Sequence, residues 1–256
     1  MLFRSGIAVV GSRDCTKYGI SQSYKFADAI SKNGICVISG LAIGIDEFAH
    51  KGALKNIGST IAVLGSGINN IYPKENIKLA NKILENGGCI ISEYPNDSEV
   101  RMSNFPKRNR IISALSEGIL VVEARHRSGS TITANLGFKQ GKKVFCVPSN
   151  IDSKLGVGTN KLIQKGAKLV INVEDILLEL GIKRLKEDIV QKWKYEEKSV
   201  PKEYKEIYRA IGNSPTDINT ICYRTNIPIQ EVSQKLTMLE IKEYIRVLPG
   251  DMFIRV

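Results

Sequence analysis

The amino-acid sequence predicts an α/β fold in which a doubly wound, mostly parallel sheet is followed by a small C-terminal domain. Short apolar runs rich in Val and Ile recur over roughly the first 180 residues, and each ends near Gly, Ser or Pro. Most segments between them have apolar residues at helical spacing. Apolar strands that alternate with amphipathic helices are typical of a parallel, Rossmann-like sheet covered on both faces. The predicted strands are residues 7–10, 35–39, 60–64, 89–92, 118–122, 143–147 and 168–171.

The helical stripes are clearest between the first four predicted strands. Apolar residues three and four positions apart lie on one face of a helix and can pack on the sheet. The stripes are formed by Tyr24, Phe26, Ala27 and Ile30, by Phe48, Ala49 and Leu54, and by Ile77, Leu79, Ala80, Ile83 and Leu84.

The pattern changes after Leu180. Residues 182–201 are highly charged, show no strand pattern and end at Pro201, so we interpret them as a linker. Three short helical patterns and a strand pair follow, which is the outline of a winged helix. We therefore predict a Rossmann-like domain of residues 1–181, a linker of 182–201 and a winged-helix domain of 202–256. Within the last domain the helices are residues 203–212, 217–224 and 228–240, and the strands are 244–248 and 252–256.

Charge points to a polyanionic partner. The 256 residues include 37 Lys and Arg against 26 Asp and Glu, a net charge of +11. Such a surplus favours nucleic acid, then an anionic membrane surface, although a solvated Lys-rich surface is also compatible with it. No apolar run is long enough to span a membrane and the start shows no signal peptide, so we expect no membrane association and a cytoplasmic location. The sequence contains five cysteines, without a Cys-x-x-Cys pair, and two histidines, so no metal site is predicted.

Several predicted strands end in small residues that could bind phosphate. The first ends at Gly11-Ser12-Arg13, the second at Ser39-Gly40, and Ser128-Gly129-Ser130 follows the fifth and precedes a helix. Ligands of doubly wound sheets lie at these carboxyl ends, where Gly exposes backbone N–H groups and helix N-termini attract anions. Tight strand-to-helix turns also need Gly, but the repetition favours phosphate binding.

The standard nucleotide motifs are incomplete. Gly65-Ser66-Gly67 supplies only the first two glycines of a dinucleotide fingerprint. The segment from Gly137 to Lys142 is one residue short of a P-loop, and Lys143 stands where Ser or Thr is required. We therefore predict neither a dinucleotide nor a nucleoside triphosphate, and no cofactor.

Arg13 distinguishes the first turn from a bare anion nest. A guanidinium beside a Gly-Ser turn can hold a phosphate with two parallel hydrogen bonds. The alternative is an ion pair with Asp14 or Glu93.

A second candidate segment is residues 101–113, where cations surround an aromatic residue. Aromatic side chains stack on bases and cations follow the backbone in proteins that bind single strands without sequence preference. Arg108 and Arg110 are predicted to open a helix, where an external anion would offset the helix dipole. They could instead pair with Glu93 or Glu123. The candidate DNA- or phosphate-binding residues here are Arg101, Phe105, Lys107, Arg108, Asn109 and Arg110.

No catalytic constellation emerges. Asp46, Glu93 and Glu123 lie near predicted strand ends and could meet in the cleft. Asp46 and His50 are four residues apart, so they could form a general base, but an orienting or capping pair is the favoured interpretation. We predict a binding protein without catalytic residues.

Together these motifs resemble the DNA processing protein A family, also called DprA or Smf. The resemblance covers about residues 6–180 in collinear order, and a weaker one covers the winged helix. The segments that carry it include Val10-Gly11-Ser12-Arg13, Ser39-Gly40-Leu41-Ala42-Ile43-Gly44-Ile45-Asp46, Ala62-Val63-Leu64-Gly65-Ser66-Gly67 with Tyr72-Pro73, Phe105-Pro106-Lys107-Arg108-Asn109-Arg110, and Ser128-Gly129-Ser130-Thr131.

The resemblance implies a homodimer, formed through the Rossmann-like domain, that holds single-stranded DNA in a basic pocket. It further implies a role in natural transformation, in which the protein protects incoming strands and helps to load the RecA recombinase. The family's pocket arginine falls on Arg13 and its aromatic residue on Phe105. A basic residue three positions before that Phe contributes in some members, but Met102 stands here, so the role passes to Arg101. The helical extension that usually precedes the Rossmann domain has no counterpart in the five or so residues before the first strand, so the chain is either a short form or truncated at its start.

Two other functions compete with this one. A nucleotide phosphoribohydrolase on a similar fold would use the acidic residues near the cleft, but its Pro-Gly-Gly-x-Gly-Thr loop is replaced by Ser128-Gly129-Ser130-Thr131. A duplex-DNA regulator would act through the winged helix, but the third helix carries Lys235 as its only basic residue. A helix that reads duplex DNA usually has more.

Overall fold

A computed structural model describes residues 5–56, 59–126, 128–182, 200–211, 216–242, 244–248 and 251–255. The chain divides into two compact units, residues 1–186 and 187–256. Most of the predicted linker, residues 182–201, lies outside the described residues.

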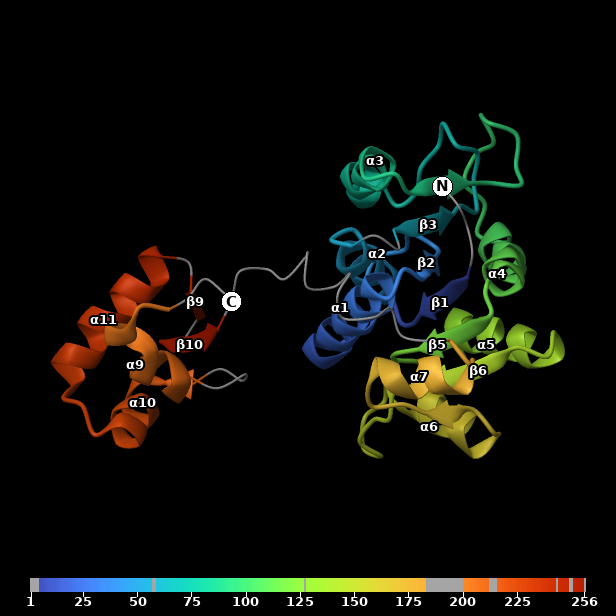
Figure 1. The fold of residues 1–256 in the computed structure, drawn as a ribbon. Helices are drawn as coiled ribbons and strands as arrows, with labels where there is room; N and C mark the ends of the chain where they lie inside the picture. The colour runs from blue at the N-terminus through green and yellow to red at the C-terminus, as the bar shows by residue number, and fades with distance from the viewer. Residues whose placement is uncertain are drawn as a thin grey trace. The chain divides into compact units, whose positions relative to one another are not determined.

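The large unit is built on a parallel sheet with the strand order β4-β3-β2-β1-β5-β6-β7 (Figure 1). All of its neighbouring strands pair in parallel. The strand order reverses between β1 and β5, so the doubly wound, Rossmann-like prediction is confirmed. The strands are β1 (Gly6–Val10), β2 (Cys36–Ser39), β3 (Thr60–Val63), β4 (Cys89–Ile91), β5 (Gly118–Val121), β6 (Lys143–Cys146) and β7 (Lys168–Leu169).

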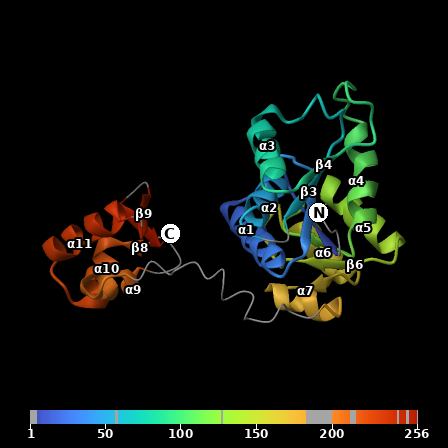
Figure 2. The same ribbon diagram turned by 45° about the horizontal axis from the view of Figure 1, so that its top comes forward.

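Helices cover both faces of this sheet. Figures 1 and 2 show α1 and α2 on one side, and α4 and α5 on the other. Side chains alternate along β1, so Ile7 and Val9 pack with α1, α2 and α7, while Ala8 and Val10 face the core under α4, α5 and α6. The helices are α1 (Lys17–Lys32), α2 (Ile45–Ala53), α3 (Ile77–Glu85, after a 3₁₀ turn at Lys74–Asn76), α4 (Asn104–Leu115), α5 (Gly129–Lys139), α6 (Val157–Gln164) and α7 (Val173–Glu179).

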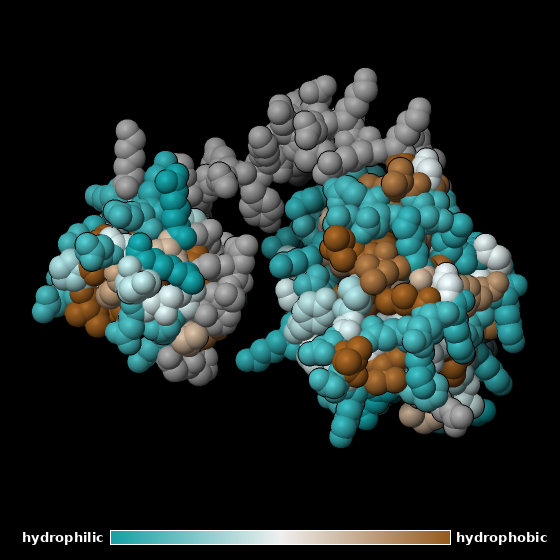
Figure 3. Space-filling model, turned by 90° about the horizontal axis from the view of Figure 1, so that it is seen from below, coloured by the Kyte–Doolittle hydropathy of each residue, from teal (hydrophilic) through white to brown (hydrophobic). Residues whose placement is uncertain are grey.

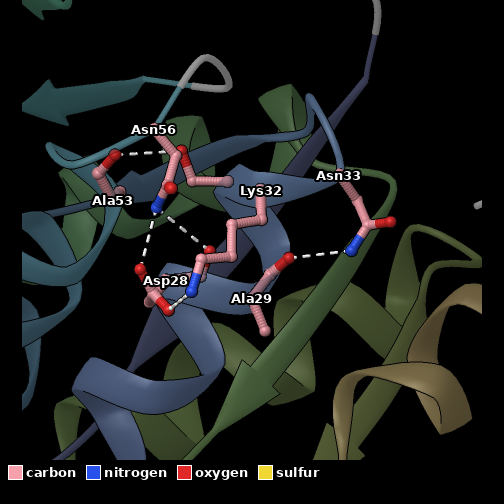
Figure 4. Close-up of polar contacts among 7 residues, drawn as sticks. Asp28, Ala29, Lys32, Asn33, Ala53 and Asn56 are labelled. Carbon is pink, nitrogen blue, oxygen red and sulfur yellow. Dashed lines mark hydrogen bonds and ion pairs between the residues drawn. The ribbon is translucent and has the colours of Figure 1, made fainter. Parts of the chain in front are cut away.

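Helix α1 packs closely against α2. A Cβ atom at Gly52 would overlap the carbonyl oxygen of Tyr24, so only glycine allows this approach. Figure 4 shows the contact between the C-terminal ends of the two helices: Asn56, just after α2, donates from Nδ2 to Asp28 Oδ1 of α1 at 2.9 Å. Lys32, also in α1, pairs with the same carboxylate at 2.6 Å. The two helices therefore form one closely packed pair in the core on this face of the sheet.

Two details of the helix predictions need correction. Ile77 and Leu84, assigned to the apolar stripe of α3, are 40% and 53% exposed, so the stripe is narrower than predicted. Helix α4 begins at Asn104, which places Arg108 and Arg110 in its second turn and not at its start. Pro106 does not prevent this early start, because a residue in the first helical turn has no intrahelical acceptor for its N–H group.

The small unit confirms the winged-helix prediction. It contains a 3₁₀ turn at Lys202–Tyr204, helices α9 (Lys205–Ala210), α10 (Ile218–Thr225) and α11 (Ile229–Ile241), and strands β8 (Thr216–Asp217), β9 (Ile245–Leu248) and β10 (Met252–Arg255). The strands form an antiparallel sheet in the order β8-β10-β9, in which the short β8 was not predicted. Its core includes Ile207, Ile221, Leu236 and Ile245.

In the part of the chain that the structure describes, every helix is too short or too polar to cross a lipid bilayer.

Candidate functional site

An open cavity of about 430 Å³ lies at the carboxyl ends of the strands, where the strand order reverses between β1 and β5. Crevices at this position are the usual ligand sites of open α/β sheets. The loop after β1, the first turns of α4 and the N-terminus of α5 form its walls. Nine predicted site residues line it: Gly11, Ser12, Arg13, Phe105, Arg108, Asn109, Ser128, Gly129 and Ser130. We call this cavity the crevice.

A smaller cavity of about 50 Å³ adjoins the crevice and shares Arg13, Phe105 and Arg108 with it. Ala42 also lines both cavities, and Gly40, Ile43, Tyr72 and Pro73 complete the lining of the smaller one. The open space beside Arg13 therefore extends from the β1–β5 reversal toward the loop after β3.

Arg13 is exposed and lies over an aromatic ring. Its guanidinium carbon is 5.1 Å from the ring centroid of Phe105, a cation–π contact. Neither expected carboxylate partner reaches it, because Asp14 pairs with Arg125 at 2.5 Å and Glu93 pairs with Arg110. Among the described residues, no carboxylate lies within ion-pair distance of Arg13. Its positive charge is available to a ligand.

Tyr72 belongs to the same aromatic group, although it was not among the predicted site residues. Its ring centroid is 5.8 Å from that of Phe105, with the planes inclined by 38°. Phe105 in turn lies against the end of β3, where a Cβ atom at Gly65 would be 2.8 Å from its ring. An aromatic residue directly before Pro73, in a loop that follows a strand end, is the signal that could have identified Tyr72.

Arg108 has an internal role, unlike the predicted contact with DNA. It is buried, and its Nη1 donates to the carbonyl oxygen of Gly40 at 2.7 Å and to that of Val63. Burial lowers the pKa of Arg108 to about 10, which the negative charge of Asp46 partly offsets. Burial also disfavours the charged form of Asp46 and so raises its pKa, while the positive charge of Arg108 acts to lower it. The guanidinium thus joins the ends of β2 and β3 beneath the site.

The prediction for Ser39 and Gly40 needs the same correction. The Ser39 hydroxyl donates to the carbonyl oxygen of Val9 at 2.7 Å, and the Gly40 N–H donates to Asp46 Oδ2 at 3.1 Å. Both residues are also buried. These hydrogen bonds already occupy their polar groups. A Cβ atom at Gly40 would overlap the Arg108 guanidinium, which explains the glycine without a phosphate.

The N-terminus of α5 opens into the crevice. Ser128 and Thr131 form a capping box, which satisfies the N–H group of Thr131. The N–H groups of Gly129 and Ser130 belong to the first turn and have no intrahelical acceptor. Asn109 links this turn to α4, because its Nδ2 donates to the carbonyl oxygen of Gly129 at 3.2 Å. These donors, with the positive end of the helix dipole, suit an anion.

The N-terminus of α1 is the position that usually holds the pyrophosphate in dinucleotide-binding folds, and here Glu123 occupies it. This buried carboxylate accepts from the Thr16 N–H at 2.9 Å and from the Thr16 hydroxyl at 2.5 Å. An internal anion therefore fills the site, in agreement with the incomplete dinucleotide motif.

The predicted pair of Asp46 and His50 is not formed. His50 Nδ1 lies 2.8 Å from the Thr60 hydroxyl, and its Nε2 is buried without a hydrogen-bond partner among the described residues. Asp46, Glu93 and Glu123 each have a different internal partner, so they do not converge on one reacting position.

Three remaining candidates lie apart from the cavities. Arg110 is exposed and pairs with Glu93, as the alternative prediction proposed. Arg101 and Lys107 are exposed, and neither lines the crevice or the smaller cavity. Met102, at the position where some family members have a basic residue, does line the crevice.

Comparison with known families agrees with this architecture. The family model described as DNA recombination-mediator protein A matches residues 1–181, and the DprA winged helix domain matches residues 196–251. The chain belongs to this family. The resemblance read from the strand-end motifs is thereby confirmed.

Individual family members show how much of the chain is shared. Protein Smf of Escherichia coli strain K12 is 40% identical over 248 residues, which is 95% of this chain and 66% of that protein. The crystal structure of DprA from Streptococcus pneumoniae has a TM-score of 0.64 at 43% identity, over 68% of this chain and 61% of that one. DprA from Helicobacter pylori, described for its unique single-stranded DNA binding mode, also has a TM-score of 0.64, at 32% identity over 71% and 82%. This chain thus spans somewhat less than two thirds of the length of the Escherichia coli and Streptococcus pneumoniae relatives.

Proposed function

We propose that this protein binds single-stranded DNA in the crevice and the adjoining small cavity. The observation that carries the proposal is Arg13: an exposed guanidinium with no carboxylate partner among the described residues, in contact with Phe105, whose ring neighbours Tyr72. Sequence-neutral binding of single strands uses this combination of cation and aromatic face.

The hydrogen-bond donors and the aromatic rings of the site suit the two parts of a nucleotide, the phosphate and the base. A phosphate can be held between Arg13, through two hydrogen bonds, and the N–H groups at the start of α5. A base that leaves the strand can stack on Phe105 or Tyr72. Because each phosphate contact releases counterions, affinity should fall steeply with salt.

The biological role follows from the family. The relatives are named DNA processing proteins, and the Helicobacter pylori member is described as binding single-stranded DNA. We infer that this chain acts in the cytoplasm in natural transformation, protects incoming single strands and helps to load the RecA recombinase onto them. Membership of the family and the lack of converging carboxylates support a binding role over a catalytic one.

We also propose that the large unit forms homodimers. Apolar side chains near the β7 edge of the sheet are unusually exposed: Ile171 by 71% and Leu178 by 81%. Figure 3 shows that hydrophobic patches interrupt the hydrophilic surface on one face of this unit. Exposed patches of this kind often mark contact surfaces, and a dimer would offer one DNA strand two crevices.

The competing functions have less support. A phosphoribohydrolase would need a free carboxylate in the cleft, yet Glu123 is buried and bonded to Thr16. A duplex reader would need cations on α11, yet Lys235 pairs with Glu231 at 2.6 Å. The winged helix therefore suits a protein-contact or auxiliary role better than base readout.

Arg13→Ala tests the proposed site. Loss of a phosphate clamp should weaken binding to oligo-dT by about 1–3 kcal/mol, measured by fluorescence anisotropy at several salt concentrations. Arg110→Ala is the matched control, because it removes the same charge from a paired arginine that lines neither cavity. That variant should bind within about threefold of the wild type, since exposed paired charges contribute little. Equal affinities for Arg13→Ala and the wild type would refute the assignment.

A further inference from the structure

A third cavity, of about 560 Å³, lies beside the crevice, between the N-terminal part of α5 and helix α6. Ser128 and Gly129 line both cavities, so the two cavities meet at the start of α5. The basic side chains on the far side are His126, Lys161 and Lys165. We call this third cavity the α5–α6 groove.

The positive charge in the groove lacks a counter-charge. Lys161 Nζ lies 3.4 Å from His126 Nε2, and both side chains are exposed. None of the described residues that line the groove is acidic, and no described carboxylate lies within ion-pair distance of Lys161 or Lys165. By contrast, Lys143 and Lys168, at the amino ends of β6 and β7, both pair with Glu179, at 2.7 and 2.8 Å. An external anion would supply what the groove lacks.

The backbone holds these groups in place. The N–H group of Gly158 donates to the carbonyl oxygen of Ala124 at 2.7 Å, and a Cβ atom at Gly158 would be 2.5 Å from that oxygen. Helix α6 is thus held directly against the loop that carries His126. Lys161 and Lys165 are four residues apart, on one face of the helical turn and about 6 Å apart along its axis. Like charges at this spacing repel, which an anion between them would relieve.

We propose that the α5–α6 groove is a second phosphate-binding subsite, which carries single-stranded DNA onward from the crevice. The strand passes over the start of α5, where Gly129 forms the shared wall. Lys161 and Lys165 then contact the phosphates of the nucleotides that follow the one held by Arg13. This inference rests on the proposed function, because it extends the same DNA strand beyond the first site.

The test is a comparison of short and long oligo-dT with the full chain. The double variant Lys161→Ala/Lys165→Ala should bind an oligonucleotide of about 30 nucleotides at least tenfold more weakly. Its plot of log affinity against log salt should be less steep by about 0.7 for each phosphate that the variant no longer neutralises. An oligonucleotide of about six nucleotides, long enough for the crevice alone, should bind within about twofold of the wild type.

The matched control is Lys143→Ala/Lys168→Ala. It removes the same two positive charges from the same unit, but at lysines already paired with Glu179. We expect this control to bind both oligonucleotides within about twofold of the wild type, so that a general loss of positive charge is excluded. Lys161→Gln/Lys165→Gln should reproduce the alanine result, which keeps the test valid if one double variant folds poorly.

The possible failures are distinguishable. If the Lys161/Lys165 variants bind the long oligonucleotide with wild-type affinity and salt dependence, the proposal for the α5–α6 groove is wrong. If Arg13→Ala still binds more weakly in that case, the proposed function of the crevice stands. Wild-type binding in all these variants would overturn both. Weaker binding accompanied by a fall in molar mass, measured by light scattering, would show instead that the groove is a contact between subunits. Weaker binding of duplex DNA alone would also contradict the proposal.

Discussion

At the scale of single residues, His50 shows how the protein keeps a titratable group neutral. It belongs to α2, is fully buried and faces Thr60 of β3. The Thr60 hydroxyl donates to the carbonyl oxygen of Val37 at 2.6 Å, so it can only accept from His50 Nδ1, 2.8 Å away. The ring therefore carries its proton on Nδ1, and Nε2 is left without a partner. Burial, with a smaller effect of Arg108, lowers the pKa of His50 to about 3.

This burial predicts a pH dependence of stability. The unfolded chain binds a proton at His50 below about pH 6.5, whereas the folded chain does so only near pH 3. The contribution of neutral His50 to stability is therefore fully present above about pH 6.5, and it is lost as the pH falls from there toward pH 3. From pH 7.5 to 5 the wild type should lose about 2 kcal/mol more unfolding free energy than His50→Gln.

Urea unfolding followed by hydrogen exchange of peptides from β2 and β3 measures this difference in the large unit alone. Comparison with the variant cancels the contributions of other titrating groups, including Asp46, whose raised pKa acts in the opposite direction. Parallel pH profiles for the two proteins would contradict the account of His50.

At the scale of secondary-structure elements, the helix starts decide which strand-end groups are free for a ligand. At the start of α1, Glu123 accepts the hydrogen bond of the Thr16 N–H group. At the end of β2, Arg108 and Asp46 bond to the carbonyl oxygen and the N–H group of Gly40. Helix α5 begins with a capping box that leaves its first N–H groups facing the crevice. Only some of the small-residue strand ends therefore remain open to phosphate.

Glu123→Ala tests the first of these arrangements. It would leave the N–H and hydroxyl groups of Thr16 without an acceptor and remove an anion from the N-terminus of α1. We expect a loss of about 3 kcal/mol in unfolding free energy, because the change also creates a cavity at a buried position. Glu123→Gln keeps an acceptor oxygen and should cost less. Urea titration monitored by circular dichroism measures both, and a loss below about 0.5 kcal/mol in Glu123→Ala would show that α1 does not depend on this contact.

The sequence predicts the elements better than it predicts the roles of the arginines. Hydrophobic periodicity located the strands, because each buried strand is a continuous apolar run. Arg13 and Arg108 look alike in sequence, since both stand near glycine-rich strand ends. Their difference arises from α4, which starts early enough to turn Arg108 into the core and leave Phe105 under Arg13. Tyr72 was missed because its proximity to Phe105 is a tertiary contact between segments more than 30 residues apart.

At the scale of the whole molecule, we expect the two units to contribute differently to the proposed DNA binding. The unpaired cations and the aromatic group described above all belong to the large unit. In the winged helix, the only lysine of α11 forms an ion pair within its own helix, and the exposed side chains of this unit include Tyr223, Met238 and Ile241. Such a surface favours contact with another protein over contact with phosphates.

Removal of the winged helix should therefore spare most of the affinity for single strands. A chain of residues 1–200 keeps the crevice and the α5–α6 groove, and we expect it to bind oligo-dT within about threefold of the full chain in anisotropy titrations at matched salt. The small unit has a hydrophobic core of its own, and none of its residues belongs to the three core clusters of the large unit. A truncated chain that keeps its fold by circular dichroism but loses its affinity would mean that the winged helix itself holds the strand. In that case Arg13→Ala should have little effect in the full chain, so the two experiments check each other.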